Sequence, residues 1–295
     1  MNDIQGMILL DKPKGMTSFS AVSAVKRIFG EKRVGHTGTL DPMATGVLPI
    51  LLGRATRLCE LMLTADKRYT AEVLLGVETD TLDITGNVIK ETDCDISASE
   101  FESVCSRFIG KYEQVPPMFS ALKKDGVRLY DLARQGVEIE REARLVNIKK
   151  LAIIEKSGKN KFIIDVICSK GTYIRSLADD LGKAIGVGAT LTMLRRTETA
   201  GYTADMCVTL DELKDNPKKY LREADSVVSY CPSVNVTDNQ TRRFLNGGEL
   251  FLERLSFDIE VSDGDLIRVY SYDNKFLGLG LVDGELLKIK CIITE

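Results

Sequence analysis

The sequence predicts an α+β protein with a small β domain at its C-terminal end. Three observations support this class. Residues 161–168 alternate apolar and polar side chains, as a half-buried strand does. Residues 97–110 and 172–186 each repeat apolar side chains with the period of an amphipathic helix. Beyond residue 229, short apolar runs recur about every 8–12 residues, which is typical of a small β-barrel or sandwich.

The first predicted elements are a strand and a helix joined by a tight turn. Residues 7–12 are apolar and lead into a Pro-Lys-Gly sequence, which predicts a short strand that ends in a turn. Thr17 or Ser18 can cap the helix that follows, and Gly30 is typical of a helix end. The residues predicted to share its buried face are Phe19, Val22, Val25 and Phe29.

The middle of the chain carries the strongest helix and strand signals. Ser97 and Glu100 have the spacing of a capping box, ahead of an apolar stripe. The residues of this stripe are Phe101, Val104, Cys105, Phe108 and Ile109. In the strand over 161–168, the residues on one face are Phe162, Ile164, Val166 and Cys168. The apolar face of the next helix consists of Ile174, Leu177, Ala178, Leu181 and Ile185.

Composition changes mark an insertion and a domain boundary. Residues 113–146, called the arm below, are rich in charge and contain two prolines, with a short helix expected near residues 129–136. A boundary is predicted near residue 229. We therefore expect a catalytic domain over 1–228, which contains the arm, and a β domain over 229–295.

Charge is unevenly distributed along the 295-residue chain. The net charge is −3, yet residues 11–68 hold ten Lys and Arg against five Asp and Glu, while residues 229–295 hold seven against eleven. A basic segment in a mildly acidic protein is able to form a phosphate-binding face. The seven cysteines are scattered singly, and no apolar run is long enough to span a bilayer, so we expect a cytoplasmic protein without a metal or a cofactor.

Residues 33–50, "RVGHTGTLDPMATGVLPI", form the most unusual stretch of the chain. A phosphate-binding loop is excluded because the stretch has no Lys-Ser/Thr pair and places Asp41 in its middle. Pro42 holds Asp41 in an extended conformation, so the residues alone allow either a structural turn or the mount of a catalytic carboxylate. The only histidine, His36, has no clustered ligands that would favour a metal site. The acidic "DTLD" segment of residues 80–83 lacks the ligand spacing of a cation loop and is interpreted as a turn.

Several motifs occur together and in order. They are "DKPKGMTS", "VGHTGTLDPMATGVLPILLGRATRL", "KRYTAEVLLGVETDTLDITG", "SALKKDGVRLYDLARQG", "CSKGTYIRSLADDLG" and "LRRT". With them the chain resembles the bacterial tRNA pseudouridine synthases of the TruB family, over about residues 7–198. The resemblance implies a pseudouridine synthase fold with a mixed, largely antiparallel central sheet flanked by helices, and a PUA-like RNA-binding domain at the C-terminal end. It also implies that the T-loop uridine at tRNA position 55 is isomerised to pseudouridine.

The resemblance assigns roles to individual residues. Asp41 matches the catalytic aspartate of the family, and Arg175 matches the arginine that forms an ion pair with it. Tyr69 matches the tyrosine that stacks on the uracil, and it is the candidate base for the C5 proton. His36 matches the histidine that takes the place of the flipped base. The remaining expected substrate-binding residues are Tyr173, Leu194 and Lys12 at the site, and Lys123, Lys124, Arg128 and Arg134 on the arm.

The expected partner is the T-arm of tRNA, with no membrane and no protein partner implied. Two alternatives remain at this point. A tRNA folding chaperone that binds the T-arm would not need Asp41. A carboxylate-based nucleosidase would release free uracil from RNA. The role of Asp41, as nucleophile or as base, stays open.

Overall fold

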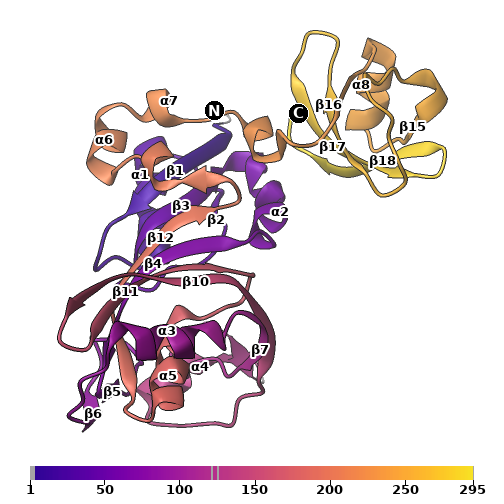
Figure 1. Ribbon diagram of the computed structural model, residues 1–295. Coiled ribbons are helices and arrows are strands. Elements are labelled where there is room, and N and C mark those ends of the chain that lie inside the picture. Colours follow the sequence, from indigo (N-terminus) through magenta and orange to yellow (C-terminus); the bar gives the residue numbers. More distant parts are fainter. Residues whose placement is uncertain (1–3, 121, 125, 295) are drawn as a thin grey trace.

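The fold is organised around one large twisted sheet, with a smaller sheet beside one end of it (Figure 1). The computed structural model describes residues 4–120, 122–124 and 126–294. Within them the large sheet has nine strands, with the central order β1-β3-β12-β4-β11-β10-β7, β2 paired to β3 and β13 paired to β12. Its strands are β1 (Gly6–Lys12), β2 (Val34–His36), β3 (Thr45–Leu52), β4 (Lys67–Leu75), β7 (Gly110–Gln114), β10 (Arg144–Gly158), β11 (Lys161–Cys168), β12 (Ala189–Thr199) and β13 (Tyr202–Thr203).

The strand pairing confirms the mixed, largely antiparallel sheet. Strand β3 runs antiparallel to β1 but parallel to β12, where Thr45 and Gly46 lie opposite Arg195 and Arg196. The other pairs along the sheet are antiparallel, including β4 with β11 and β4 with β12. The parallel contact joins two segments that are about 150 residues apart in the sequence. It therefore brings residues 41–46 close to the "LRRT" motif.

Short helices pack against the large sheet, and others lie between its last strand and the smaller sheet (Figure 1). The α-helices are α1 (Ser18–Phe29), α2 (Cys59–Leu63), α3 (Ala98–Ser106), α4 (Leu129–Arg134), α5 (Ile174–Ile185), α6 (Leu210–Asp215), α7 (Pro217–Tyr220) and α8 (Asp238–Leu245). The 3-10 helices are η1 (Gly53–Leu58), η2 (Ala204–Met206), η3 (Ala224–Val228) and η4 (Leu252–Arg254). The capping box predicted at Ser97 and Glu100 is formed at the start of α3.

Helix α1 differs from its prediction in the face that it buries. Thr17 is its N-cap and Gly30 its C-cap, as expected, but Phe19 is 77% exposed. The buried side chains of the helix are those of Ser18, Ala21, Val22, Ala24 and Val25. The prediction for Phe19 is wrong because Ser18 turns inward to bind the loop that contains Leu40. Val22 and Val25 are buried as predicted and Phe29 is partly buried, so Phe19 alone lies outside the inward face.

The main core lies between the sheet and helices α1, α3 and α5. The predicted inward face of β11 is confirmed, since Phe162, Ile164, Val166 and Cys168 are completely buried. Phe162 packs against Phe101 of α3, with ring centroids 4.6 Å apart. Ile109 is half exposed because α3 ends before it and the chain turns into β7. The core thus fixes the start of α5, where Arg175 lies.

The arm contains little regular structure. Between β7 and β10 lie a two-stranded sheet of β8 (Lys123–Lys124) and β9 (Val127–Arg128), then helix α4, which agrees with the short helix predicted there. A second short hairpin, β5 (Val77–Thr79) with β6 (Val88–Glu91), encloses the loop over residues 80–87. Both excursions leave the large sheet on the side that carries α5 (Figure 1).

The chain ends in a five-stranded sheet with its own core. The strands are β14 (Ser233–Asn235), β15 (Leu250–Phe251), β16 (Leu266–Tyr270), β17 (Phe276–Asp283) and β18 (Leu286–Ile292), in the order β14-β16-β17-β18-β15. Phe244 of α8 is completely buried among them. The boundary at residue 229 and the PUA-like character of this part stay predictions. None of the described helices has both the length and the apolar character that a membrane crossing needs.

Candidate active site

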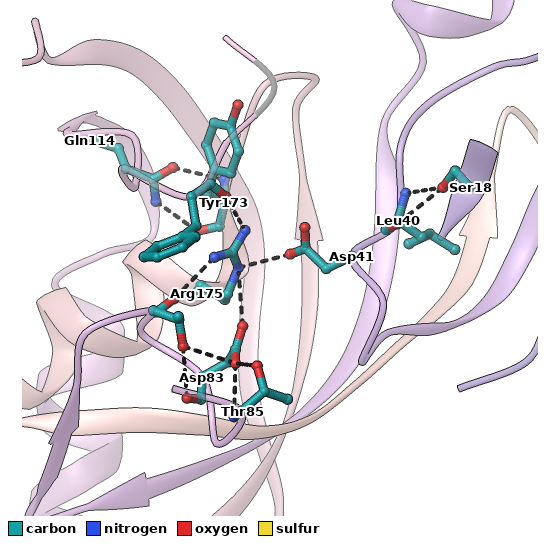
Figure 2. A network of polar contacts seen from close by, with 10 residues as sticks. Ser18, Leu40, Asp41, Asp83, Thr85, Gln114, Tyr173 and Arg175 are labelled. Carbon is teal, nitrogen blue, oxygen red and sulfur yellow. Dashed lines mark hydrogen bonds and ion pairs between the residues drawn. The ribbon is translucent and has the colours of Figure 1, made fainter. Parts of the chain in front are cut away.

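The loop that carries Asp41 is held from two directions. It connects β2 with β3, and Ser18 at the start of α1 binds the residue before Asp41 (Figure 2). The hydroxyl of Ser18 accepts a hydrogen bond from the Leu40 N–H (2.8 Å) and donates one to the Leu40 carbonyl (3.0 Å). The Ala44 N–H donates to the Asp41 carbonyl at 3.0 Å. These three hydrogen bonds fix the backbone on both sides of the Asp41 side chain.

Arg175 binds Asp41 from the first turn of α5. Its Nε lies 2.8 Å from Oδ2 of Asp41, and its side chain is only 4% exposed, against 32% for Asp41. Nη1 donates to the Thr81 carbonyl (3.0 Å), and Nη2 donates to the Phe119 carbonyl of the arm (2.8 Å). One planar guanidinium thus connects the loop that carries Asp41, the loop over residues 80–87 and the arm. The expected pairing of Arg175 with Asp41 has the geometry of a charge-assisted hydrogen bond.

Asp83 completes this cluster and was missed by the sequence analysis. Its Oδ2 lies 3.7 Å from Nε of Arg175, the same nitrogen that binds Asp41 (Figure 2). Its Oδ1 accepts hydrogen bonds from the Thr85 N–H (2.9 Å) and the Thr81 hydroxyl (3.1 Å). Asp83 is 7% exposed, so Arg175 lies between one buried carboxylate and one accessible carboxylate. The local "DTLD" sequence gave no indication of a partner 92 positions further along the chain.

Tyr69 and Leu194 come from adjacent central strands, β4 and β12. Both are 6% exposed in the same core region. Burial is the main influence on the Tyr69 phenol and raises its pKa, while the neighbouring Arg196 opposes this shift. Asp41 is close enough to Tyr69 to raise the pKa further. The phenol and the carboxylate therefore lie in one electrostatic environment.

Tyr173 is fixed by a residue that the sequence analysis did not single out. Gln114, at the end of β7, accepts a hydrogen bond from the Tyr173 N–H (2.8 Å) and donates one to the Tyr173 carbonyl (3.1 Å). Gln114 is 1% exposed. These two bonds set the backbone of Tyr173 at the N-cap of α5, two residues before Arg175. They also tie the base of the arm to the site.

Lys12 and His36 lie close to the catalytic loop. Lys12 is completely buried, and its Nζ donates to the carbonyls of Pro13 (2.9 Å) and Met16 (2.6 Å). Burial lowers the pKa of Lys12 to about 8, with Asp41 acting in the opposite direction. His36 lies at the end of β2, where its Nδ1 accepts a hydrogen bond from the Gly38 N–H at 3.3 Å. Burial, and then Arg196, lower the pKa of His36, which favours the neutral imidazole near pH 7.

Lys124 and Arg134, two basic residues of the arm, each make a contact away from this cluster. Lys124 is exposed and donates to the Glu140 carbonyl at 3.1 Å. Arg134 is exposed on α4, with its guanidinium 5.4 Å from the centre of the Tyr130 ring. The side chains of Lys123 and Arg128 lie outside the described part of the structure. The arm contacts the site through Gln114, which binds Tyr173, and through the Phe119 carbonyl, which binds Arg175.

The geometry suits a reaction in which the Asp41 carboxylate alone attacks a substrate atom or stabilises a positive charge on it. Only Oδ2 of Asp41 is bound by Arg175, and no donor among the described residues reaches its Oδ1. No group of three or more His, Cys, Asp or Glu side chains within the described ranges is placed to hold a metal ion. An accessible carboxylate oxygen beside a buried tyrosine is able to act on an electron-poor carbon atom of a nucleotide.

The chain matches one protein family along most of its length. Residues 26–174 match the family described as TruB family pseudouridylate synthase (N terminal domain). Residues 175–231 match the tRNA pseudouridylate synthase B C-terminal domain, and residues 232–290 match the family called Pseudouridine synthase II TruB, C-terminal.

Curated relatives and solved structures agree with this match. A protein of Burkholderia mallei named tRNA pseudouridine synthase B is 41% identical, over 99% of this chain and 98% of its own length. One of Haemophilus influenzae with the same name is 40% identical, over 99% and 96%. A chain of a Cbf5-Nop10-Gar1 complex superposes with a TM-score of 0.74 at 26% identity, over 98% of this chain and 85% of its own.

The fold and these matches define the chain as a pseudouridine synthase, an enzyme of the isomerase class. Within that class, the chain belongs to the TruB family. The fold class and the family predicted from the sequence are therefore confirmed.

The depressed pKa of Lys12 predicts a pH-dependent contribution to stability. A lysine whose pKa is about 8 in the folded protein and near its usual 10.5 in the unfolded chain loses its proton first in the folded state. The unfolded state then binds more protons between these two values, so stability from this group rises with pH. The free energy of unfolding of the wild type, measured relative to Lys12→Met, should rise by about 1–3 kcal/mol from pH 7.5 to 10. Urea denaturation at several pH values measures it.

Lys14 provides the control for this titration, because it is exposed and lies two positions away. Lys14→Met should leave the pH slope of stability equal to that of the wild type. A flat difference between wild type and Lys12→Met across this pH range would contradict the assignment.

Proposed function

We propose that this enzyme converts the T-loop uridine at tRNA position 55 to pseudouridine, with Asp41 as its essential catalytic residue. The observation that carries the proposal is the position of the Asp41 carboxylate: Arg175 holds its Oδ2 at 2.8 Å, no described donor binds its Oδ1, and the side chain is 32% exposed. The names of the relatives, tRNA pseudouridine synthase B, support tRNA as the substrate. The seven cysteines of this enzyme are all free thiols, which supports a cytoplasmic location.

The isomerisation needs one bond broken and one formed on the same ribose. The N1–C1′ bond of the uridine breaks, the base turns, and C5 bonds to C1′ while it loses its proton and N1 gains one. Asp41 assists the first step as a carboxylate held next to the reacting ribose. Tyr69 stacks on the uracil and accepts the C5 proton, directly or through water. Burial raises the pKa of Tyr69, so the phenol is protonated at the start of the reaction. In this proposal the phenol first gives its proton to N1 of the detached base, and the resulting phenolate then accepts the C5 proton.

Access to the uridine requires that the base leave the folded T-loop. Flipping a base out costs a few kcal/mol, which contacts with the enzyme must offset. His36 at the end of β2 fills the vacated place, and its neutral imidazole adds no charge there. Tyr173 and Leu194 line the pocket that receives the flipped base. Lys12 supports this pocket from beneath through the carbonyls of Pro13 and Met16.

The arm closes over the T-arm of the tRNA. Lys124 and Arg134 are exposed on it and contact phosphates, as Lys123 and Arg128 do in this proposal. Such contacts position the RNA without reading its sequence. Because Phe119 of the arm accepts a hydrogen bond from Arg175, the position of the arm is linked to the catalytic ion pair.

Replacing Asp41 tests the function. Asp41→Asn keeps the size of the side chain but removes the negative charge, so we expect formation of pseudouridine in a T-arm hairpin to fall by about 1,000-fold or more. Single-turnover assays with purified protein measure the rate, and filter binding measures affinity. A rate near that of the wild type contradicts the proposal. Release of free uracil by the wild type would instead favour a nucleosidase, and tRNA refolding alone would favour a chaperone.

Replacing Asp83 tests the cluster behind the ion pair. Asp83→Asn removes the second carboxylate that faces Arg175, which weakens a buried charge-assisted contact, so we expect the single-turnover rate to fall by about 10- to 100-fold. RNA affinity should stay the same. Asp80→Asn is the matched control, because Asp80 lies in the same loop but binds Asn87. Equal losses in the two variants would show that the loop, not the charge facing Arg175, matters.

A further inference from the structure

Arg196 is a buried charged residue for which the proposed function gives no role. It lies on β12 of the large sheet, and its side chain is only 1% exposed although it carries a charge. The preceding residue, Arg195, is different, since its side chain is 35% exposed and forms an ion pair with Asp11 at 2.7 Å. A guanidinium that solvent does not reach has no access to RNA phosphates. Any role of Arg196 must therefore act through neighbouring protein groups.

The contacts of Arg196 are with the catalytic loop, with β3 and with Tyr69. Its Nε donates to the Val47 carbonyl (2.8 Å), and its Nη2 donates to the Gly38 carbonyl (3.1 Å). Tyr69 lies directly opposite it on β4, and Arg196 is close enough to the hydroxyl of Tyr69 to lower its pKa. Among the residues that the structure describes, no carboxylate lies within ion-pair distance of Arg196. Burying such a cation is costly unless its N–H groups are bound, and here the carbonyls of Val47 and Gly38 bind two of them.

Two glycines of the "GHTGTLDPMATG" motif make room for this residue. Gly46 has φ +105°, and a Cβ atom there would lie 2.1 Å from the backbone oxygen of Arg196. Gly38 has φ +132°, and a Cβ atom there would lie 3.4 Å from Nη1 of Arg196. Both glycines flank the segment that carries Asp41. The motif therefore brings the catalytic loop against Arg196 on both sides of the catalytic residue.

We propose that Arg196 is a positioning residue, which holds the hydroxyl of Tyr69 in a fixed place relative to the loop that carries Asp41. This inference rests on the proposed function, in which Tyr69 accepts the C5 proton. The guanidinium suits the task because its planar fork is able to bind a loop carbonyl, a strand carbonyl and a phenol at once. A lysine has no such fork.

The charges around Tyr69 are consistent with this role. Arg196 faces the phenol from β12, Cys168 from β11 and Asp41 from the catalytic loop. Of these three, Arg196 is the group that lowers the pKa of Tyr69, against the effects of burial, Cys168 and Asp41. Arg196 therefore favours loss of the proton from the hydroxyl that it is proposed to orient.

The test combines substitutions at the two positions. Arg196→Lys should lower the single-turnover rate on a T-arm hairpin by about tenfold or more, with the dissociation constant changed by less than about threefold. In a Tyr69→Phe background the same substitution should change the residual rate by less than about threefold, because the hydroxyl it positions is gone. Arg195→Lys is the matched control and should leave the rate nearly unchanged. The control variant alters the exposed neighbour on the same strand.

Two results would overturn the inference. One is an equal loss from Arg196→Lys in the wild-type and Tyr69→Phe backgrounds, which shows that Arg196 does not act through Tyr69. The other is a loss of rate in Arg196→Lys that is fully explained by weaker RNA binding.

A second measurement covers the case in which Arg196 variants do not fold. The side-chain 15N resonances of Arg196 are compared between wild type and Tyr69→Phe, a variant of nearly equal volume. Loss of the hydroxyl should shift the Arg196 guanidinium resonances and leave those of Arg195 in place, and unshifted Arg196 resonances would refute the contact. This readout needs no catalysis, so it separates failure of the inference from failure of the proposed function.

Discussion

The candidate site depends on the buried guanidinium of Arg175. A buried arginine must have its N–H groups bound, and here Asp41 and the carbonyls of Thr81 and Phe119 bind them. These partners lie in three segments that are far apart in the sequence. Because the guanidinium is planar and its donors have fixed directions, the segments must converge in one arrangement. That arrangement, together with the hydrogen bonds between Ser18 and Leu40, sets the orientation of the Asp41 carboxylate.

The large sheet provides a rigid floor beneath this cluster. Strand β3 is paired with β1 on one side and with β2 and β12 as well, so the loop that precedes it is attached to a strand held by three others. Two cations are buried in this floor, Lys12 on β1 and Arg196 on β12, and both are held by backbone carbonyls. The buried charge of Arg196 lowers the pKa of Lys12, His36 and Tyr69, so it acts on the groups around the Asp41 loop without meeting solvent.

The sequence predicted what depends on local patterns. Alternation identified the inward face of β11, and capping residues identified the starts of α1 and α3. It did not predict that Phe19 is exposed, because that depends on Ser18 binding a loop 22 residues away. Asp83 and Gln114 were missed for the same reason: each acts on a residue far along the chain. The pairing of Asp41 with Arg175 was expected only through resemblance to a family, since neither residue has a local signal for it.

The account makes the ion pair between Arg175 and Asp41 the organising contact of catalysis. The most direct test is the single-turnover rate of Arg175→Lys on a T-arm hairpin, measured together with RNA affinity. Lysine keeps the charge but reaches only one of the partners in the plane of the guanidinium. The account predicts a rate loss of about 100-fold or more with unchanged affinity. A variant that forms pseudouridine at nearly the wild-type rate would contradict it.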